Sequence, residues 1–206
     1  IAASLEKKRL RDREVSYLRQ IQEEKQRSDD LLHIILPHDV AQELKVTQAV
    51  KPRRFENVSV LFCDIVSFTA WCDKHAPHEV LTHLQSLVEA FERISFECGL
   101  EKIKTIGDSF VATAGLLAPA TNPALDCVRC GLAMIEKAKE LPPHWQVRVG
   151  VHVGPVMAGV VGRRKYQYDI WGDTVNTAAR MEQAALPGSI CVTADTWHLL
   201  AAHYHG

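Results

Sequence analysis

The sequence lacks several features that mark specialised classes of protein. No apolar run approaches the roughly 20 residues that a membrane-spanning helix needs. Neither sign of charge dominates, because 24 Lys and Arg residues balance 25 Asp and Glu residues. We therefore expect no nucleic-acid partner. The 206 residues are 47% hydrophobic and 24% charged, which is typical of one globular domain with a short appendage.

The six cysteines form no pattern of a disulfide-rich or zinc-binding protein. The single C-x-x-C, at Cys127 and Cys130, has no second pair and lies in a predicted helix. A redox or zinc site competes there with two packed core residues, and we favour packing. Free thiols fit a reducing compartment, so we expect a cytoplasmic location. Because Ile1 falls inside a helical pattern, we take the chain as part of a longer protein, which leaves a membrane-anchored parent open.

The first 36 residues predict a long charged helix with a narrow apolar seam. Its heptad positions are Leu10, Tyr17, Ile21, Leu31 and Ile35, and a neighbouring stripe holds Val15, Leu18, Leu32 and Leu36. A parallel coiled coil is our interpretation, and a solvated single helix is the alternative. Pro37 ends this helix, residues 39–44 predict a short helical turn, and residues 46–56 predict a linker.

The remainder predicts alternating strands and helices. Strands are expected at 58–64, 103–106, 109–114 and 146–153, with helices that begin at Pro77 and Pro123 between them. This β-α-β-β-α-β order is the ferredoxin-like arrangement of the α+β class. Additional C-terminal pieces follow: a glycine-rich hairpin at 154–162, strands at 166–170 and 189–193, and helices that begin at Thr174 and Thr193.

Two aspartates should meet at one edge of this sheet. Asp64 ends the first predicted strand, and Asp108 lies in the turn between the second and third strands. The first and third strands of such a sheet are neighbours, so the two carboxylates converge. Paired carboxylates with few other ligands suit Mg²⁺ or Mn²⁺ bridged to a phosphate. The alternative is that Asp64 caps the next turn and Asp108 is an ordinary turn residue.

Four further polar residues could contact a nucleotide. Lys104 and Asp169 lie on separate strands, and together they could donate to adenine N1 and accept from its N6 amino group. Guanine reverses both polarities and would be rejected. Asn176 and Arg180 are one helical turn apart, so they share a helix face. Arg180 could stabilise a phosphate, or it could form a surface salt bridge with Glu182 or Asp173.

Four ordered motifs make the sequence resemble the class III nucleotidyl cyclases over roughly residues 32–206. They occupy residues 62–69, 101–108, 148–154 and 168–176. The resemblance implies that Asp64, Asp108 and the backbone carbonyl of Ile65 hold two divalent cations, Mg²⁺ or Mn²⁺. It also implies that Lys104 and Asp169 select adenine, where guanylate cyclases have Glu and Cys. Asn176 would orient the ribose, and Arg180 would stabilise the transition state.

The implied activity is an adenylate cyclase that converts ATP to 3′,5′-cyclic AMP and pyrophosphate. The family works as a head-to-tail dimer, in which one protomer supplies the metal aspartates and the other supplies the base, ribose and transition-state residues. This chain carries both sets, so a homodimer would have two complete sites. A parallel coiled coil would then relay a signal from an upstream sensor or membrane domain.

The resemblance also divides the chain. Residues 1–45 are expected to be a signalling helix and transducing element, residues 46–56 a linker, and residues 57–206 the catalytic domain. The family's triphosphate-binding Lys follows the last helix seen here, so we expect the domain to be truncated at its C-terminus. Three alternatives stay open: a guanylate cyclase, a catalytically silent dimerisation module, and a diguanylate cyclase, whose hairpin motif differs from residues 107–110.

Overall fold

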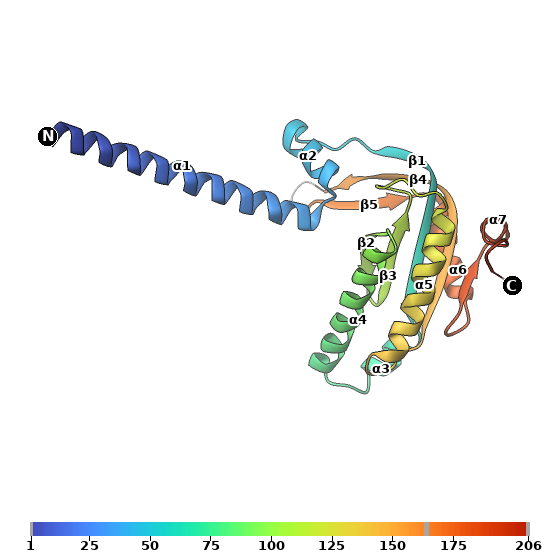
Figure 1. The fold of residues 1–206 in the computed structure, drawn as a ribbon. Helices are drawn as coiled ribbons and strands as arrows, with labels where there is room; N and C mark the ends of the chain where they lie inside the picture. Colours follow the sequence, from blue (N-terminus) through green and yellow to red (C-terminus); the bar gives the residue numbers. More distant parts are fainter. Residues whose placement is uncertain (1, 163–164, 205–206) are drawn as a thin grey trace. The chain divides into compact units, whose positions relative to one another are not determined.

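The computed structural model describes residues 2–162 and 165–204, without the side chains of residues 2–10, 12, 33 and 34. The chain divides into two compact units (Figure 1). The first comprises residues 1–50 with the segment 162–167, and the second comprises residues 51–161 and 168–206. The second unit contains the sheet and every residue for which a catalytic role is predicted.

The first unit consists of two helices separated at Pro37. Helix α1 spans Ala2–Ile35 and helix α2 spans His38–Thr47. Lys45 of α2 forms an ion pair with Asp29 of α1 at 2.8 Å. The predicted heptad side chains Tyr17, Ile21, Leu31 and Ile35 are each more than half exposed, as are Val15 and Leu18. The side chain of Leu10 lies outside the described residues. Helix α1 thus carries an exposed apolar stripe.

The second unit is built on one mixed sheet. Its strands are β1 (Arg53–Ile65), β2 (Glu101–Ile106), β3 (Ser109–Ala114), β4 (Val147–Val161), β5 (Gln167–Trp171) and β6 (Ile190–Val192). The strand order is β2-β3-β1-β4-β5, with β6 parallel to β4. Its helices are α3 (Phe68–Cys72), α4 (Pro77–Glu97), α5 (Pro123–Glu140), α6 (Asp173–Ala184) and α7 (Ala194–His198). The predicted β-α-β-β-α-β core is therefore confirmed, as are the C-terminal strands and helices other than the hairpin expected at 154–162.

Helices α5 and α6 cover opposite faces of this sheet. A Cβ built on Gly131 of α5 would lie 3.0 Å from Val149 of β4. A Cβ on the next strand residue, Gly150, would lie 2.0 Å from the backbone nitrogen of Glu182 in α6. Successive strand residues point to opposite faces, so each helix has its own face. Figure 1 shows α4 beside α5, and α4 contributes Leu87 and Phe91 to the same core.

Three boundaries differ from the sequence-based prediction. The expected hairpin at 154–162 is wrong, because β4 runs without interruption to Val161. Its glycines serve close packing instead: a Cβ on Gly154 would lie 2.6 Å from the Thr174 hydroxyl, and one on Gly159 would lie 3.3 Å from Pro52. Strand β1 begins at Arg53, inside the expected linker. Helix α3 was not predicted, because its five residues are too short to establish a helical period.

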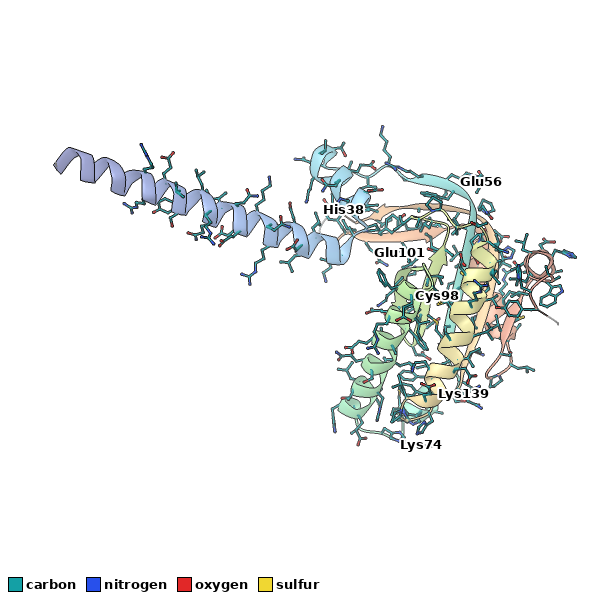
Figure 2. All side chains as sticks on the ribbon, viewed as in Figure 1. His38, Glu56, Lys74, Cys98, Glu101 and Lys139 are labelled. Carbon is teal, nitrogen blue, oxygen red and sulfur yellow. The ribbon has the colours of Figure 1, made fainter. Side chains whose placement is uncertain are left out.

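The C-x-x-C cysteines are packed core residues. Cys127 and Cys130 are fully buried, where Cys127 contacts Ser59 of β1 and Cys130 contacts Ser95 of α4. All six cysteines are free thiols, and Cys98 (Figure 2) is one of the three that are partly exposed. Burial raises the pKa of Cys127 to about 12. Such a thiol stays protonated and unreactive near neutral pH.

Candidate active site

The first cluster of polar residues lies where β1 ends. Asp64 is the penultimate residue of β1, and Asp108 occupies the turn between β2 and β3, where Gly107 has φ +63°. Phe110 of β3 lies opposite Cys63 of β1, so the register brings the turn beside Asp64. The sheet therefore brings these two predicted residues together.

The two carboxyl groups interact directly. Burial raises the pKa of Asp108 above its ordinary value, and the charge of Asp64 raises it further. The nearby backbone of Asp108 itself and of Ile65 lowers the pKa of Asp108 and partly offsets this rise. Asp64, Ile65 and Asp108, which were predicted to act together, thus form one contiguous group.

Two residues that sequence reasoning did not single out complete this cluster. Arg148 of β4 lies directly opposite Asp64 in the strand register, and its Nη2 donates to Asp64 Oδ2 at 2.9 Å. Arg148 Nε also lies 2.5 Å from Oε1 of Glu182 in α6. The Glu182 side chain is only 7% exposed, and burial raises its pKa, with the charge of Asp64 adding to the effect. We call Asp64, Asp108, Arg148 and Glu182 the carboxylate cluster.

The sequence alone could have indicated Arg148 as a residue that needs a partner, but not which residue that partner is. Arg148 interrupts an apolar strand, as Lys104 does, and an isolated charge in such a strand asks for a partner. Identifying Asp64 as that partner requires the register of β1 against β4, which the sequence does not contain. Glu182 lies six residues from Asn176, so it does not share the helix face that had been considered.

The second cluster is a single ion pair that joins the two ends of the sheet. Lys104 of β2 and Asp169 of β5 lie on the first and last strands of the path β2-β3-β1-β4-β5. Even so, Lys104 Nζ donates to Asp169 Oδ2 at 2.5 Å. The sheet must therefore curl until its outer strands approach each other. The Asp169 side chain is 11% exposed and its other oxygen, Oδ1, accepts from the N–H of Ile170. We call Lys104 and Asp169 the cross-sheet ion pair.

Both clusters lie on one face of the sheet, about 12 Å apart. Lys104 is opposite Val111, which is opposite Phe62, and residues opposite each other in antiparallel strands share a face. Asp64 is two residues beyond Phe62 on that face. Two strand spacings and two residue steps give a separation of about 12 Å between the Cα atoms of Lys104 and Asp64.

Asn176 and Arg180 lie apart from both clusters. They occupy the exposed side of α6, whose buried residue Ala178 faces β4 at Gly150. Among the described residues, neither side chain has a hydrogen bond or ion pair. The surface salt bridge that was considered for Arg180 with Glu182 is therefore not formed, because Glu182 contacts Arg148 instead.

The carboxylate cluster has the chemistry of a site for a hard divalent cation. In the described part of the chain, no group of three or more His, Cys, Asp or Glu side chains is arranged to hold a metal ion. Mg²⁺ characteristically takes only one or two carboxylates and completes its shell with water and substrate phosphates. Asp64 and Asp108 are such a pair, and their mutual repulsion, seen in the raised pKa of Asp108, favours a cation between them.

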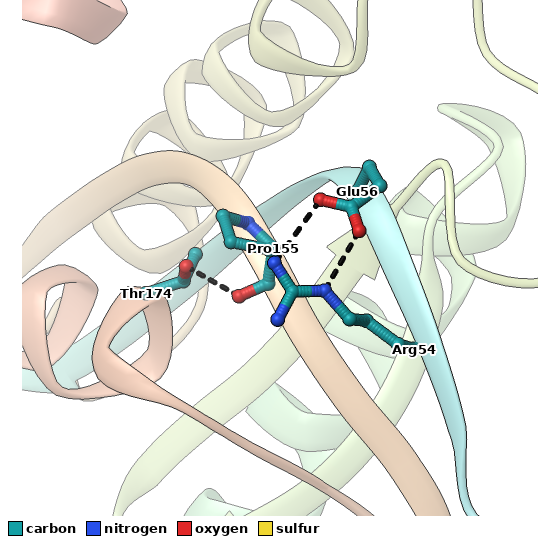
Figure 3. Close-up of polar contacts among 4 residues, drawn as sticks. All are labelled: Arg54, Glu56, Pro155 and Thr174. Atoms are coloured by element: carbon teal, nitrogen blue, oxygen red, sulfur yellow. Dashed lines mark hydrogen bonds and ion pairs between the residues drawn. The ribbon is translucent and has the colours of Figure 1, made fainter.

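Elsewhere, an open pocket of about 380 Å³ adjoins the start of α6. Its lining includes His152, Gly154, Trp171 and Asp173. Figure 3 shows two contacts at this pocket: Thr174 donates to the carbonyl of Pro155 at 2.7 Å, and Arg54 pairs with Glu56 at 2.7 Å. The first contact fastens the start of α6 to β4, whereas the second lies within β1. No predicted catalytic side chain enters this lining.

The fold, an α+β sheet with a carboxylate pair at the β1 end, is that of nucleotide cyclase catalytic domains. A sequence profile described as the adenylate and guanylate cyclase catalytic domain matches residues 50–205. The chain belongs to this family. The receptor-type guanylate cyclase gcy-13 of Caenorhabditis elegans is 36% identical over 95% of this chain and 20% of its own length. Guanylate cyclase soluble subunit beta-2 of Rattus norvegicus is 37% identical over 81% of this chain and 25% of its own length.

Solved structures give the same assignment. The guanylate cyclase domain of RhGC from Catenaria anguillulae, in complex with GTP, has a TM-score of 0.71 at 29% identity, covering 74% of this chain and 86% of that one. A catalytic core described as a rhodopsin-guanylyl cyclase with converted specificity, in complex with ATPαS, has a TM-score of 0.71 at 30% identity over 75% and 86% of the two chains. The chain spans about a fifth to a quarter of the curated relatives it matches.

Proposed function

We propose that this chain is an adenylate cyclase domain, which makes 3′,5′-cyclic AMP and pyrophosphate from ATP. The observation that carries the proposal is the contact of Lys104 with Asp169. One donor and one acceptor, held together in a half-buried position, match the N1 acceptor and N6 donor of adenine. Guanine presents a donor at N1 and an acceptor at O6, so both contacts would be repulsive.

A guanylate cyclase is the second candidate, because the curated relatives named above are guanylate cyclases. Overall similarity does not decide the base, since few residues read it. The relative described as having converted specificity is a rhodopsin-guanylyl cyclase in complex with ATPαS. This chain has Lys and Asp at the two positions where guanylate cyclases are expected to have Glu and Cys. We therefore give those two residues more weight than the identity of the whole domain.

The remaining roles follow from the family assignment. Asp64, Asp108 and the carbonyl of Ile65 would hold two divalent cations, Mg²⁺ or Mn²⁺. Such cations, when bound, lower the pKa of the 3′-hydroxyl and offset the charge of the phosphates. Asn176 would orient the ribose, while the Arg180 guanidinium would stabilise negative charge that develops at the α-phosphate during in-line attack. Their exposed, unpaired position on α6 leaves both side chains available.

Two copies of the chain would assemble each site. We propose a homodimer with head-to-tail catalytic domains and a parallel coiled coil along α1. The exposed stripe of α1, which includes Tyr17, Ile21, Leu31 and Ile35, would supply the seam. In the described part of the chain no helix is apolar enough over sufficient length to cross a membrane. We place the domain in the cytoplasm and expect an upstream sensor or membrane domain in the parent protein.

The activity assay uses equal ATP and GTP with Mn²⁺ and identifies the cyclic product. We expect cyclic AMP, and we expect Asp64→Ala to abolish it. Cyclic GMP as the main product would show that the assignment of Lys104 and Asp169 is wrong. A parallel assay uses a form of the protein extended beyond residue 206. Activity in the longer form alone would indicate that the expected triphosphate-binding Lys lies in the added segment.

Insertions in α1 test the coiled coil. Lengthening the helix by one to four residues before Pro37 rotates the partners by about 100° for each residue. Basal activity should vary with the inserted number, because small rotations assemble or separate a site at an interface. A seven-residue insertion, which restores the heptad phase, is the matched control. Activity that stays flat across the series would contradict a transmitting coiled coil.

A further inference from the structure

Arg148 is held between two carboxylates that come from different elements. Its Nη2 donates to Asp64 Oδ2 at 2.9 Å, and its Nε lies 2.5 Å from Glu182 Oε1. The Arg148 side chain is 32% exposed, whereas that of Glu182 is 7% exposed. The sequence analysis considered Glu182 only as a surface partner of Arg180 and gave Arg148 no role of its own.

The contact with Glu182 has the distance of an ion pair without the geometry of a hydrogen bond. Among the described residues, Arg148 Nε and Glu182 Oε1 each lack a hydrogen-bond partner. A buried carboxylate with an unsatisfied oxygen is costly unless it serves a charge nearby. Arg148 is therefore shared between two partners and satisfies Asp64 better than Glu182.

Glu182 cannot move away from this position. Helix α6 lies directly on β4, and a Cβ on Gly150 would come within 2.0 Å of the Glu182 nitrogen and 2.4 Å of the Ala178 carbonyl oxygen. The backbone that carries Glu182 is thus fixed against the strand that carries Arg148. Asp64, by contrast, stands near the end of β1, where the sheet gives way to a turn.

The charges of the cluster explain why a second partner is useful. Asp64, Asp108 and Glu182 supply three negative charges, and Arg148 supplies one positive charge. Arg148 donates to one of the two Asp64 oxygens, Oδ2, and its positive charge beside Asp64 opposes a cation that binds there. Without Glu182, the guanidinium would stay on Asp64 and oppose the cation. With Glu182, the guanidinium has an alternative partner at contact distance.

We infer that Glu182 is a positioning residue that draws Arg148 away from Asp64 and so sets the affinity of the site for its divalent cations. The inference rests on the metal assignment made in the proposed function. It extends that assignment to two residues outside the predicted ligand set. Arg148 then acts as an internal counter-ion, which competes with the metal for Asp64.

The test measures Mn²⁺ binding to the full chain without nucleotide, through the paramagnetic resonance signal of free Mn²⁺. Glu182→Gln keeps the size of the side chain and removes its charge, so Arg148 should neutralise Asp64 more fully. We expect the Mn²⁺ dissociation constant to rise about tenfold. In an Arg148→Gln background, the same substitution should change it less than about twofold, because the competitor is gone. Arg148→Gln alone should tighten binding.

Three results would overturn the inference. Equal weakening by Glu182→Gln in both backgrounds would mean that Glu182 attracts the metal directly. Unchanged binding in Glu182→Gln, or unchanged or weaker binding in Arg148→Gln, would mean that Arg148 does not compete. The matched control is Glu97→Gln, which removes an exposed carboxylate of α4 and should leave Mn²⁺ binding unchanged. The melting temperature of each variant shows whether it is still folded. Mn²⁺ binding that survives Asp64→Asn would instead disprove the metal assignment of the proposed function.

Discussion

The carboxylate cluster and the cross-sheet ion pair lie on one face of a sheet but differ in their balance of charge. In the first, two carboxylates contact one guanidinium and a third, Asp108, adjoins Asp64, so negative charge is in excess. The second matches one ammonium with one carboxylate at 2.5 Å, so it is neutral. Excess negative charge suits divalent cations, whereas a neutral donor and acceptor suit an uncharged base. The comparison shows that charge balance, more than burial, distinguishes the two regions.

The largest effect is expected at the carboxylate cluster. Asp64→Asn or Asp108→Asn removes half of the carboxylate pair, and cyclase activity should fall by about 10³-fold or more, which corresponds to about 4 kcal/mol of transition-state stabilisation. The melting temperature should stay within a few degrees of the original, because Asp108 is held with a raised pKa and its charge costs folding energy. Activity assays with Mn²⁺ and thermal unfolding check both expectations. Retained activity in either variant would remove the cluster from the catalytic site.

Substitutions in the cross-sheet ion pair should change the choice between ATP and GTP rather than abolish cyclase activity. The single substitutions Lys104→Glu and Asp169→Cys each leave one polar group without its partner, so activity with ATP should fall about 100-fold. The double substitution restores a consistent pattern for guanine, and the product ratio should move towards cyclic GMP. Product analysis with competing ATP and GTP is the measurement. A double variant that kept its preference for ATP would show that other residues select the base.

Helix α6 also distinguishes the two regions. It contributes Glu182 to the carboxylate cluster, whereas Lys104 and Asp169 both lie on strands. Gly150→Ala would force α6 away from β4, since the added Cβ would lie 2.0 Å from the Glu182 nitrogen. We expect a loss of about 3 kcal/mol in the free energy of unfolding. Gly159→Ala, which meets Pro52 at 3.3 Å, is the milder control. Equal losses of stability for the two variants in denaturant titrations would mean that α6 is not packed tightly against β4.

The smallest effect concerns the strand that carries Asp169. Burial raises the pKa of Tyr168 to about 12, and the charge of Glu101 adds to it. A raised pKa means that the folded state favours the neutral phenol, so its contribution is present below about pH 10 and is lost between pH 10 and 12. Over that window wild type should lose up to about 2 kcal/mol more stability than Tyr168→Phe. Denaturation measured at several alkaline pH values checks this, and parallel curves would contradict it.

The sequence predicted the order of elements well, because strands and helices here have clear periods and clear ends. Pro77 and Pro123 begin their helices as predicted, and the Asn122 side chain caps α5 by accepting from the Leu125 N–H. Gly154 and Gly159 led to the wrong prediction of a hairpin, since a tight turn and close packing against a neighbouring segment both select glycine. Local sequence cannot separate these two reasons for a glycine.

Local sequence was likewise sufficient for only part of the candidate site. Asp64 and Asp108 were predicted to converge because strand topology alone brings them together. The pairing of Lys104 with Asp169 was proposed from the chemistry of adenine, but its geometry depends on the curl of the whole sheet. Arg148 and Glu182 were missed, because one requires the β1–β4 register and the other requires the contact of α6 with Gly150. Neither is encoded by spacing along the chain.

The central claim is that the two clusters of one chain serve different sites in a dimer. Its most direct test co-expresses Asp64→Asn and Asp169→Asn chains under different affinity tags and assays the purified mixed dimers. Each parent should retain no more than about a hundredth of the wild-type activity with ATP. Mixed dimers place both intact clusters in one of their two sites, so they should recover about half of the wild-type activity per dimer. Mixed dimers as inactive as the parents would contradict the account, because both clusters would then have to come from one chain.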